Sequence, residues 1–250
     1  MKTVKALLLV GGEGTRLRAV VSSTPKPLAP VGDRPFLELV VRGLQAQGIR
    51  DLVMCTGYRA EQLEEAFGDG SRLNVKIVYS RERSPLGTAG AVKLARGFLE
   101  GESEFLVLNG DSFLETGFED LIRFHRAHSG LATIAAVPVE NASRYGALQV
   151  NEEGRVRAFM EKSAGNGPGL INAGVYVFSS GILDRIPEGP ASLEREVLPQ
   201  ALELGVYALR QSGVFIDIGT PSDYARAQEI HRRLLEAAFH GTTAAPVHGG

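Results

Sequence analysis

Several features are scarce or absent in this sequence, and each absence narrows what the protein can be. The chain of 250 residues contains one cysteine, Cys55, so no disulfide can form within it. The formal net charge is only −2, which argues against a general surface for nucleic acid or acidic membranes. No apolar run approaches membrane-spanning length, and the run at residues 6–10 is too short for a signal peptide. We therefore expect a cytoplasmic protein that binds neither nucleic acid nor membrane, with Cys55 as a buried, unreactive thiol.

Two familiar phosphate-binding motifs are missing from the glycine-rich stretch near the N-terminus. Residues 4–10 form a short apolar run, which favours a buried strand, and Gly-Gly-Glu-Gly-Thr-Arg follows at residues 11–16. A P-loop ends in Gly-Lys-Ser/Thr, whereas here Arg16 is followed by Leu17. The dinucleotide-binding pattern G-x-G-x-x-G needs its third glycine at the position of Leu17. The second absence disfavours a nicotinamide dehydrogenase.

The glycine-rich stretch can nevertheless bind an anion. Gly11, Gly12 and Gly14 have no Cβ, so their backbone can approach a ligand and point several N–H groups into one concavity. Arg16 adds positive charge, and the prolines on both sides of Lys26 stiffen its segment and hold its ammonium in place. Taken alone, a glycine-rich loop after a strand is more often only a tight turn.

The remaining chain alternates strand and helix patterns at short intervals. Strands are predicted at residues 51–56, 74–79, 104–108, 131–139, 147–150, 156–159, 170–178, 206–209 and 214–218. Helices are predicted at residues 35–47, 61–67, 91–99, 118–128, 192–204 and 224–238. The alternation is typical of an α/β fold with a mostly parallel sheet covered on both faces. A hairpin turn at residues 151–154 marks a change to paired strands, and residues 241–250 are predicted to form a disordered tail.

Two motifs together resemble a known family. G-G-x-G-T-R-L at residues 11–17, followed by P-K-P at residues 25–27, resembles the signature of the sugar-phosphate nucleotidylyltransferases, and further matches run to Tyr224. These enzymes join a sugar 1-phosphate to a nucleoside triphosphate and release pyrophosphate. The resemblance implies a Rossmann-like, three-layer α/β/α nucleotidyltransferase fold of the glycosyltransferase-A-like type. It implies one domain over residues 1–240, with a nucleotide-binding part before about residue 138 and a small sugar-binding β subregion after it.

The resemblance assigns the nucleotide to three segments of the chain. The implied nucleotide-binding residues are Leu9, Gly11, Gly12, Gly14, Thr15, Arg16, Pro85, Leu86, Gly87, Thr88, Asn109 and Gly110. The motif P-L-G-T-A-G at residues 85–90 is especially similar to the guanylyltransferase branches, whereas thymidylyl- and uridylyltransferases more often carry a glutamine here. This similarity implies GTP as the nucleotide. Without the resemblance, the same motif predicts a turn in which Thr88 caps a helix at residues 91–99.

Two aspartates are candidates for a metal site. Asp111 follows the predicted strand at residues 104–108, at the edge where open α/β sheets bind ligands, although a lone aspartate more often caps a turn. Its N-G-D context resembles the family's metal site, and Asp217 in D-I-G-T-P-x-D-Y resembles the second metal carboxylate. A triphosphate favours a hard cation with oxygen ligands, so Mg²⁺ is the expected cofactor. The resemblance gives Arg16, Lys26 and Asp111 catalytic roles.

The sugar 1-phosphate is assigned by the resemblance to the second half of the chain. Tyr145 and Gly146 resemble the family's Y-G, and Glu161 and Lys162 resemble its F-x-E-K, with Lys162 on the phosphate. Packing of a hairpin and a solvated ion pair are the respective alternatives. Asn172 interrupts an apolar strand, and because a buried unpaired amide costs about 1–3 kcal/mol, we expect a sugar hydroxyl as its partner.

The resemblance leaves the acceptor open among three sugars. The segments at residues 18–21, 35–38 and 144–146 look most like D-glycero-α-D-manno-heptose 1-phosphate guanylyltransferases. Mannose 1-phosphate guanylyltransferase is the alternative, and N-acetylmuramate 1-phosphate uridylyltransferase is the third. A catalytically silent relative that binds nucleotide sugars is a rival from another class, which would be expected to lack some of the residues that are present here. The oligomeric state, a homo-oligomer included, is left open.

Overall fold

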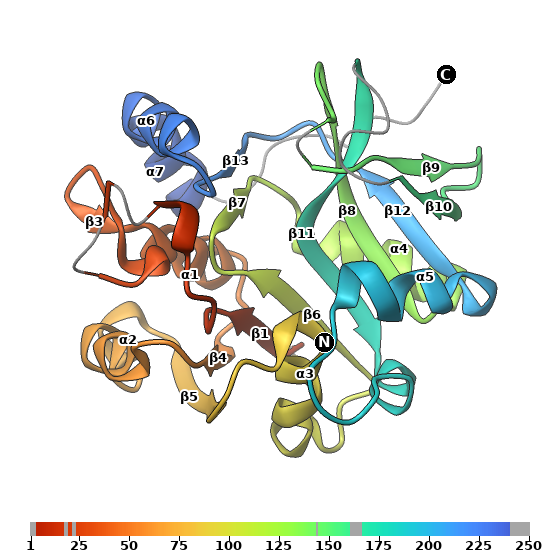
Figure 1. Cartoon of the computed structure of the whole chain (residues 1–250), viewed down its shortest axis with the longest axis horizontal. Coiled ribbons are helices and arrows are strands. Elements are labelled where there is room, and N and C mark those ends of the chain that lie inside the picture. The colour runs from red at the N-terminus through yellow and green to blue at the C-terminus, as the bar shows by residue number, and fades with distance from the viewer. Residues whose placement is uncertain (1–3, 18–19, 22–23, 144, 161–166, 241–250) are drawn as a thin grey trace.

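A seven-stranded sheet forms the centre of the computed structural model, which describes residues 4–17, 20–21, 24–143, 145–160 and 167–240 (Figure 1). The order of the strands across the sheet is β12-β8-β11-β6-β1-β4-β5. Their bounds are β1 Ala6–Leu9, β4 Asp51–Thr56, β5 Lys76–Arg81, β6 Glu104–Asn109, β8 Ala132–Val139, β11 Gly169–Ser179 and β12 Val206–Arg210.

The sheet is parallel except where β11 enters it. β1 pairs in parallel with β4 and β6, β4 with β5, and β8 with β12, whereas β11 runs antiparallel to both β6 and β8. The predicted α/β fold with a mostly parallel sheet is confirmed. Leu9, Cys55 and Asn109 are aligned at the ends of their strands, so the loops that follow them meet at one edge of the sheet. Ligands of open α/β sheets bind at this carboxyl edge.

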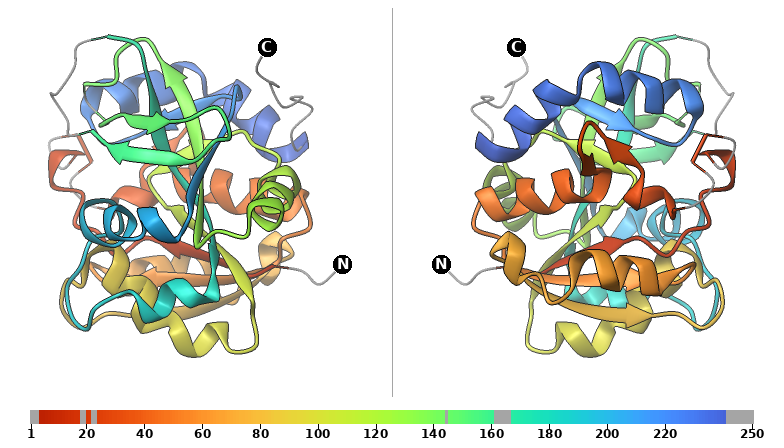
Figure 2. Two further views of the ribbon diagram at one scale, coloured as in Figure 1. Left: turned by 90° about the vertical axis from the view of Figure 1, so that its right-hand side faces the viewer. Right: turned by 90° about the vertical axis from the view of Figure 1, so that its left-hand side faces the viewer.

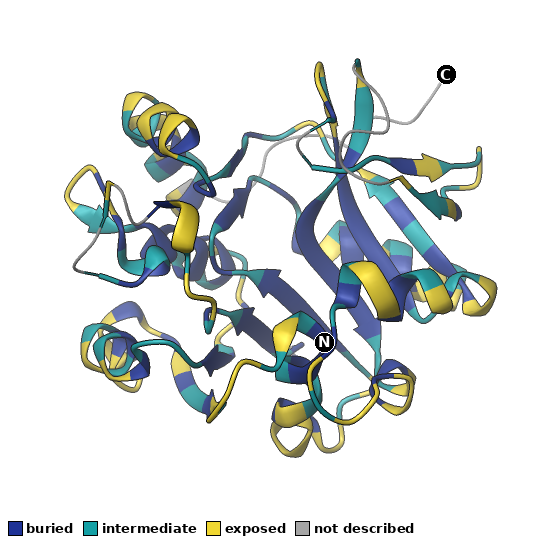
Figure 3. Ribbon diagram, in the orientation of Figure 1, coloured by how far each residue is buried: buried dark blue, intermediate teal, exposed yellow. Residues whose placement is uncertain are grey.

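Helices cover both faces of the sheet, as the side views in Figure 2 show. Their bounds are α1 Phe36–Ala46, α2 Ala60–Phe67, α3 Gly87–Leu94, α4 Phe118–His128, α5 Leu198–Gln200, α6 Pro221–Glu229 and α7 His231–His240. Side chains of β1 alternate between two buried clusters: Ala6 and Leu8 pack with residues of α1, α2, α4 and α7, and Leu7 packs with residues of α3 and α5. The strands between these layers are buried almost throughout (Figure 3), which accounts for their short apolar runs.

Short elements complete the chain. The 3₁₀ turns are η1 Thr15–Leu17, η2 Lys26–Leu28, η3 Ser71–Leu73, η4 Ala95–Leu99, η5 Ser180–Asp184 and η7 Leu202–Leu204, and η6 Leu193–Val197 is a π-helix. The small strand pairs are β2 Pro30–Val31 with β3 Arg34–Pro35, β7 Ser112–Leu114 with β13 Phe215–Asp217, and β9 Leu148–Val150 with β10 Val156–Phe159. The predicted hairpin β9–β10 is therefore present, but it forms a sheet of its own rather than part of the central one.

The helices at residues 91–99 and 192–204 were predicted with wrong bounds or type. The first begins earlier, at Gly87, and continues only as the 3₁₀ turn η4. The second is divided into η6, α5 and η7. Pro199 lies in α5, and a proline has no N–H to donate and crowds the carbonyl of the preceding turn, which explains the irregular geometry. Ser192 does act as the predicted cap, because its hydroxyl accepts the Arg195 N–H.

The predicted helix at residues 224–238 is two helices. α6 starts earlier because Thr220 caps it, accepting the Asp223 N–H, and Pro221 suits the first helical turn. α6 ends at Glu229, where His231 Nδ1 hydrogen bonds with the Gln228 carbonyl, and α7 follows. The predicted tail at residues 241–250 lies outside the described residues.

The single cysteine and the lack of long apolar runs both have a counterpart in the structure. Cys55 is buried in β4, and burial together with the negative charge of Glu82 raises the pKa of its thiol to about 12. A thiol with such a pKa remains protonated and unreactive at neutral pH, as predicted. Over the part of the chain that the structure describes, the helices are too short or too polar for any of them to cross a membrane.

Candidate active site

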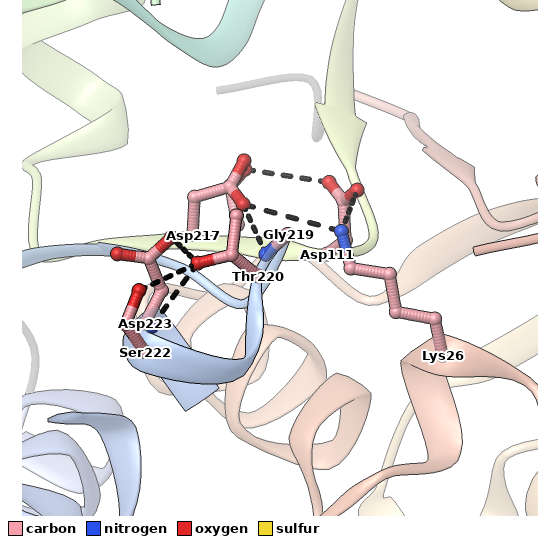
Figure 4. Close-up of polar contacts among 8 residues, drawn as sticks. Lys26, Asp111, Asp217, Gly219, Thr220, Ser222 and Asp223 are labelled. Carbon is pink, nitrogen blue, oxygen red and sulfur yellow. Dashed lines mark hydrogen bonds and ion pairs between the residues drawn. The ribbon is translucent and has the colours of Figure 1, made fainter. Parts of the chain in front are cut away.

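A partly buried lysine lies between two aspartates at the carboxyl edge of the sheet (Figure 4). Lys26 Nζ is 2.6 Å from Asp111 Oδ2 and 4.0 Å from Asp217 Oδ1. Lys26 opens η2 directly after Pro25, and its side chain is only 9% exposed. The stiff proline-flanked segment thus places the ammonium beside the aspartates. The structure brings together three residues that span about 190 positions of the sequence.

The two aspartates meet because β7 and β13 pair. Ser112 at the start of β7 is opposite Asp217 at the end of β13, and the Ile218 N–H donates to the Asp111 carbonyl. The Ser112 hydroxyl is 3.4 Å from Asp111 Oδ1 and 3.3 Å from Asp217 Oδ2, so it can donate to either carboxylate. Ser112 was missed in the sequence, because the pairing of β7 with β13 was not predicted.

The charges of this cluster influence one another. Burial raises the pKa of Asp217, and the neighbouring Asp111 raises it further, while Lys26 and the Gly219 N–H lower it. Two carboxylates that repel each other are stabilised by a cation between them. Within the described residues, no group of three or more His, Cys, Asp or Glu side chains could hold a metal. Mg²⁺ commonly takes one or two carboxylates and completes its shell with water and substrate phosphates, so this oxygen donor set fits it.

A pocket of about 210 Å³ lies beside Lys26 and Asp111. It is lined by Leu9, Val10, Gly12, Gly14, Thr15, Arg16, Lys26, Pro27, Asp111 and Gly219. The structure therefore brings the proposed catalytic residues and most of the glycine-rich loop to one cavity. Beside it, the side-chain oxygen of Asn109 is buried and has no hydrogen-bond partner among the described residues.

The glycines of the loop differ in how much space surrounds their Cα atoms. Gly14 has a φ of 59°, and a Cβ on it would lie 2.8 Å from Lys26 Cβ. Glycine is therefore required at residue 14 both by the backbone conformation and by the close approach of Lys26. A Cβ on Gly12 would meet no heavy atom within 4 Å, so its open face is available to a ligand.

Glu82 connects the glycine-rich loop to the segment at residues 85–88. Its Oε2 accepts the Leu86 N–H at 3.1 Å, and its Oε1 lies 3.0 Å from where a Cβ on Gly11 would be. Burial raises the pKa of this carboxyl, while the Leu86 N–H lowers it. Glu82 was missed in the sequence, although it carries the signal that singled out Asp111, an acidic residue directly after a parallel strand.

Thr88 does not cap a helix, as it would if the segment at residues 85–90 were only a turn. It lies in the first turn of α3, whose N-cap position is occupied by Leu86. Its hydroxyl accepts the Leu193 N–H and donates to Glu194 Oε2, both at 2.8 Å. Thr88 thus contacts the π-helix η6 rather than the backbone of its own helix.

The residues expected around the sugar are only partly described. Tyr145 packs edge-to-face against Phe215 with ring centroids 5.9 Å apart, and Gly146 has a φ of 79°. Asn172 Nδ2 donates to the Tyr176 hydroxyl, and its Oδ1 accepts the Gly174 N–H, both at 2.9 Å. Asn172 therefore does not need a sugar hydroxyl to satisfy its amide, because the chain itself supplies partners; its assignment to the sugar stays a prediction from the resemblance. Glu161 and Lys162 lie outside the described residues.

Comparisons with known proteins agree with this geometry. The sequence pattern of the family described as Nucleotidyl transferase matches residues 5–233. The mannose-1-phosphate guanylyltransferase catalytic subunit beta of Drosophila pseudoobscura pseudoobscura is 40% identical over 223 residues, 88% of this chain and 60% of the relative. The probable mannose-1-phosphate guanylyltransferase 1 of Oryza sativa subsp. japonica is 38% identical over 250 residues, 98% of this chain and 69% of the relative.

A solved structure shares the fold over nearly the full length of this chain. HddC from Yersinia pseudotuberculosis, crystallised in complex with GMP-PN, has a TM-score of 0.82 and 32% identity, and the match covers 92% of this chain and 100% of HddC. The chain spans about 60% of the length of the insect relative, so the similarity concerns only that share of it. The match to the family pattern over most of the sequence, together with these relatives, shows that the chain belongs to the nucleotidyl transferase family.

Proposed function

We propose that the protein is a sugar-1-phosphate guanylyltransferase, which transfers GMP from GTP to a sugar 1-phosphate and releases pyrophosphate. The observation that carries the proposal is the Lys26 ammonium between Asp111 and Asp217, beside a glycine-rich pocket. The names of the relatives and the GMP-PN complex of HddC support guanine as the base.

The reaction is a single displacement at phosphorus. An oxygen of the sugar 1-phosphate attacks the α-phosphorus of GTP, the bond from that phosphorus to the β-phosphate oxygen breaks, and pyrophosphate leaves with the electron pair. The attacking phosphate is already ionised, so no general base and no covalent enzyme intermediate are required. The main task of the protein is then to hold two polyanions that repel each other in line.

Different residues bind the triphosphate, the metal ion and the sugar 1-phosphate. The amides of residues 11–15 and the exposed Arg16 bind the triphosphate, and Lys26 neutralises charge near the reacting phosphates. Asp111 and Asp217, together with phosphate oxygens, would hold Mg²⁺, which supplies further charge neutralisation. Lys162 would bind the acceptor phosphate, while Tyr145, Gly146, Glu161 and Asn172 would surround the sugar.

Glu82 is our candidate for the selection of guanine. Guanine presents N1–H and N2–H₂ donors side by side, and an ionised carboxylate, which only accepts, can bond both. Glu82 lies between the glycine-rich loop and Leu86, which belong to two of the three segments assigned to the nucleotide. We expect Glu82→Gln to lower kcat/KM for GTP by about tenfold or more, with a much smaller change for UTP or dTTP. Glu104→Gln, at the far end of β6, is the matched control; an equal loss with every nucleotide after Glu82→Gln would exclude base selection.

The acceptor is either D-glycero-α-D-manno-heptose 1-phosphate or mannose 1-phosphate. The patterns at residues 18–21, 35–38 and 144–146 favour the heptose, whereas the names of the relatives favour mannose. A pyrophosphate-release assay with GTP and Mg²⁺ over both acceptors, and with UTP and N-acetylmuramate 1-phosphate, separates them by kcat/KM. GTP binding without pyrophosphate release from any pair would instead indicate a silent nucleotide-binding relative.

A further inference from the structure

Glu194 lies at the centre of a hydrogen-bond network that the reaction as described does not use. Its Oε2 accepts from the Thr88 hydroxyl at 2.8 Å and from the Ser192 hydroxyl at 3.1 Å, and its Oε1 accepts from the Tyr176 hydroxyl at 3.1 Å. Tyr176 in turn accepts from Asn172 Nδ2 at 2.9 Å. A continuous chain of hydrogen bonds therefore runs from the start of α3 through η6 to β11.

The backbone holds the two sides of this network in close contact. The Ala89 N–H donates to the Ala191 carbonyl, and the Ala191 N–H donates to the Leu86 carbonyl, both at 2.9 Å. A Cβ on Gly87, whose φ is 70°, would lie 2.5 Å from the Ala191 carbonyl oxygen. The loop that opens α3 is thus fixed against the segment before Glu194, and it has little freedom to move without it.

The chemistry of the network makes Glu194 its common acceptor. An ionised carboxylate has no proton to donate, so three neighbouring hydroxyls can all donate to it at once. Tyr176 is fully buried, which makes the loss of its acceptor costly. Glu194 is also on a π-helix, a rare geometry that is frequent at functional sites.

We propose that Glu194 is a positioning residue that joins the loop assigned to the base, through Thr88, to the strand assigned to the sugar, through Tyr176 and Asn172. The inference rests on the proposed function. Thr88 is assigned to the nucleotide and Asn172 to the sugar, and a displacement in line requires both substrates to be held in one frame. Glu194 supplies that frame without touching either substrate.

Substitutions on the two sides of the network test this role. Thr88→Val and Tyr176→Phe each remove one hydroxyl with little change of shape. We expect each to raise the KM of both GTP and the sugar 1-phosphate by roughly three- to tenfold, although Thr88 is assigned to the nucleotide only and Tyr176 bonds only with Glu194 and the sugar-assigned Asn172. The double variant should be little worse than the worse single variant, because both lose the same connection. Thr88→Ser, which keeps the hydroxyl, should recover most of the loss caused by Thr88→Val.

Control variants distinguish a role in positioning the substrates from a role in the stability of the fold. Tyr79→Phe removes the hydroxyl that donates to the Gly68 carbonyl on the remote edge strand β5, and it should leave both KM values unchanged. Glu194→Gln should reproduce the double variant; should it fail to fold in thermal unfolding, the two hydroxyl variants still decide. The assay uses GTP with mannose 1-phosphate, or with the heptose 1-phosphate where the wild type prefers it.

Two kinds of outcome would overturn the proposal. If Thr88→Val changes only the KM of GTP and Tyr176→Phe only that of the sugar 1-phosphate, with additive effects, the two sides are independent. If all variants lower the unfolding temperature while both KM values stay unchanged, the network only braces the fold. A wild-type protein that releases no pyrophosphate would instead refute the proposed function, which is a distinct result.

Discussion

The two halves of the central sheet use their polar side chains in different ways. In the half formed by β1, β4, β5 and β6, Lys26 and Asp111 at the carboxyl edge face a pocket. In the half formed by β8, β11 and β12, polar side chains hydrogen bond to one another, as Asn172 does with Tyr176 and His125 with Thr133. The antiparallel strand β11 lies where the two halves meet.

This difference has a physical cause. Parallel strands place all their carboxyl ends at one edge, so the loops of the first half expose amides and charged groups that a polyanion can bind. In the second half, the polar side chains of Thr133 on β8 and of Asn172 and Tyr176 on β11 hydrogen bond to other groups of the protein. Buried polar groups must find partners inside the protein, because each one left unpaired costs about 1–3 kcal/mol. We therefore expect substitutions of pocket residues in the first half to lower turnover, and substitution of a buried polar residue such as His125 in the second half to lower stability.

The largest expected effect is that of Lys26→Ala on turnover. The substitution removes the ammonium next to Asp111 and Asp217 and leaves their charges, and those of the phosphates, without neutralisation. We expect kcat to fall by about 10²-fold or more, and Asp111→Ala to cause a loss of similar size. Lys76→Ala, an exposed lysine on the edge strand β5, is the matched control in a pyrophosphate-release assay. Near-normal turnover of Lys26→Ala would remove the main support for the proposed chemistry.

A pair of glycine variants can separate ligand binding from folding within the same loop. In Gly14→Ala, the new Cβ meets Lys26 Cβ at 2.8 Å and the backbone has a φ of 59°, so we expect a loss of about 1–2 kcal/mol in unfolding free energy as well as of activity. In Gly12→Ala, the new Cβ meets no atom of the protein. If phosphate lies against Gly12, this variant should unfold like the wild type but bind GTP about tenfold more weakly.

Chemical denaturation and isothermal titration with GTP and Mg²⁺ measure the two effects. The pair is informative because the sequence changes are identical and two residues apart. Normal GTP affinity in Gly12→Ala would place the triphosphate elsewhere in the pocket. Normal stability in Gly14→Ala would show that the loop adapts to a side chain at residue 14.

Local motifs made most of the first half predictable from the sequence. The strand before Gly11, the proline-flanked Lys26 and Asp111 after β6 are each recognisable within a few residues, and Figure 4 shows that the structure brings Lys26 and Asp111 together. α1 and α4 were predicted to within one residue, because their apolar spacing is regular. The roles of these residues in binding and catalysis stay predictions.

Contacts between distant segments could not be predicted in the same way. Thr88 was considered as a cap for its own helix, whereas its hydroxyl bonds with Leu193 and Glu194, more than 100 residues later. Asn172 was predicted to bind a sugar hydroxyl because its partner in the structure, the Tyr176 hydroxyl, could not be recognised from an apolar strand sequence. The division of the predicted helix after Ser192 was also missed, although Pro199 is a local signal that a regular helix is interrupted there.

The smallest expected effect is a loss of stability at low pH that is caused by His125. It tests whether buried polar groups stabilise the second half of the sheet. The side chain of His125 is 3% exposed on α4, and its Nδ1 and Nε2 lie 3.0 Å from the hydroxyls of Thr133 and Ser179. Ser179 donates its proton to the Gly130 carbonyl, so Nε2 carries the hydrogen and Nδ1 accepts from Thr133. Burial lowers the pKa of His125 below its usual value, and Arg126 and His128 lower it further against the opposing effect of Glu104.

The direction of the effect follows from this pKa. Above pH ~6.5, His125 is neutral in the folded and the unfolded chain, and it adds no pH dependence. Below that pH the unfolded chain binds a proton that the folded chain excludes, so the unfolding free energy falls by up to about 1.4 kcal/mol per pH unit until the folded pKa is reached. His125→Gln cannot titrate, so its deficit relative to the wild type in urea denaturation should be larger at pH 7 than at pH 5. A deficit that is the same at both pH values would mean that His125 titrates alike in both states, and that the second half does not stabilise its buried polar groups in the way proposed.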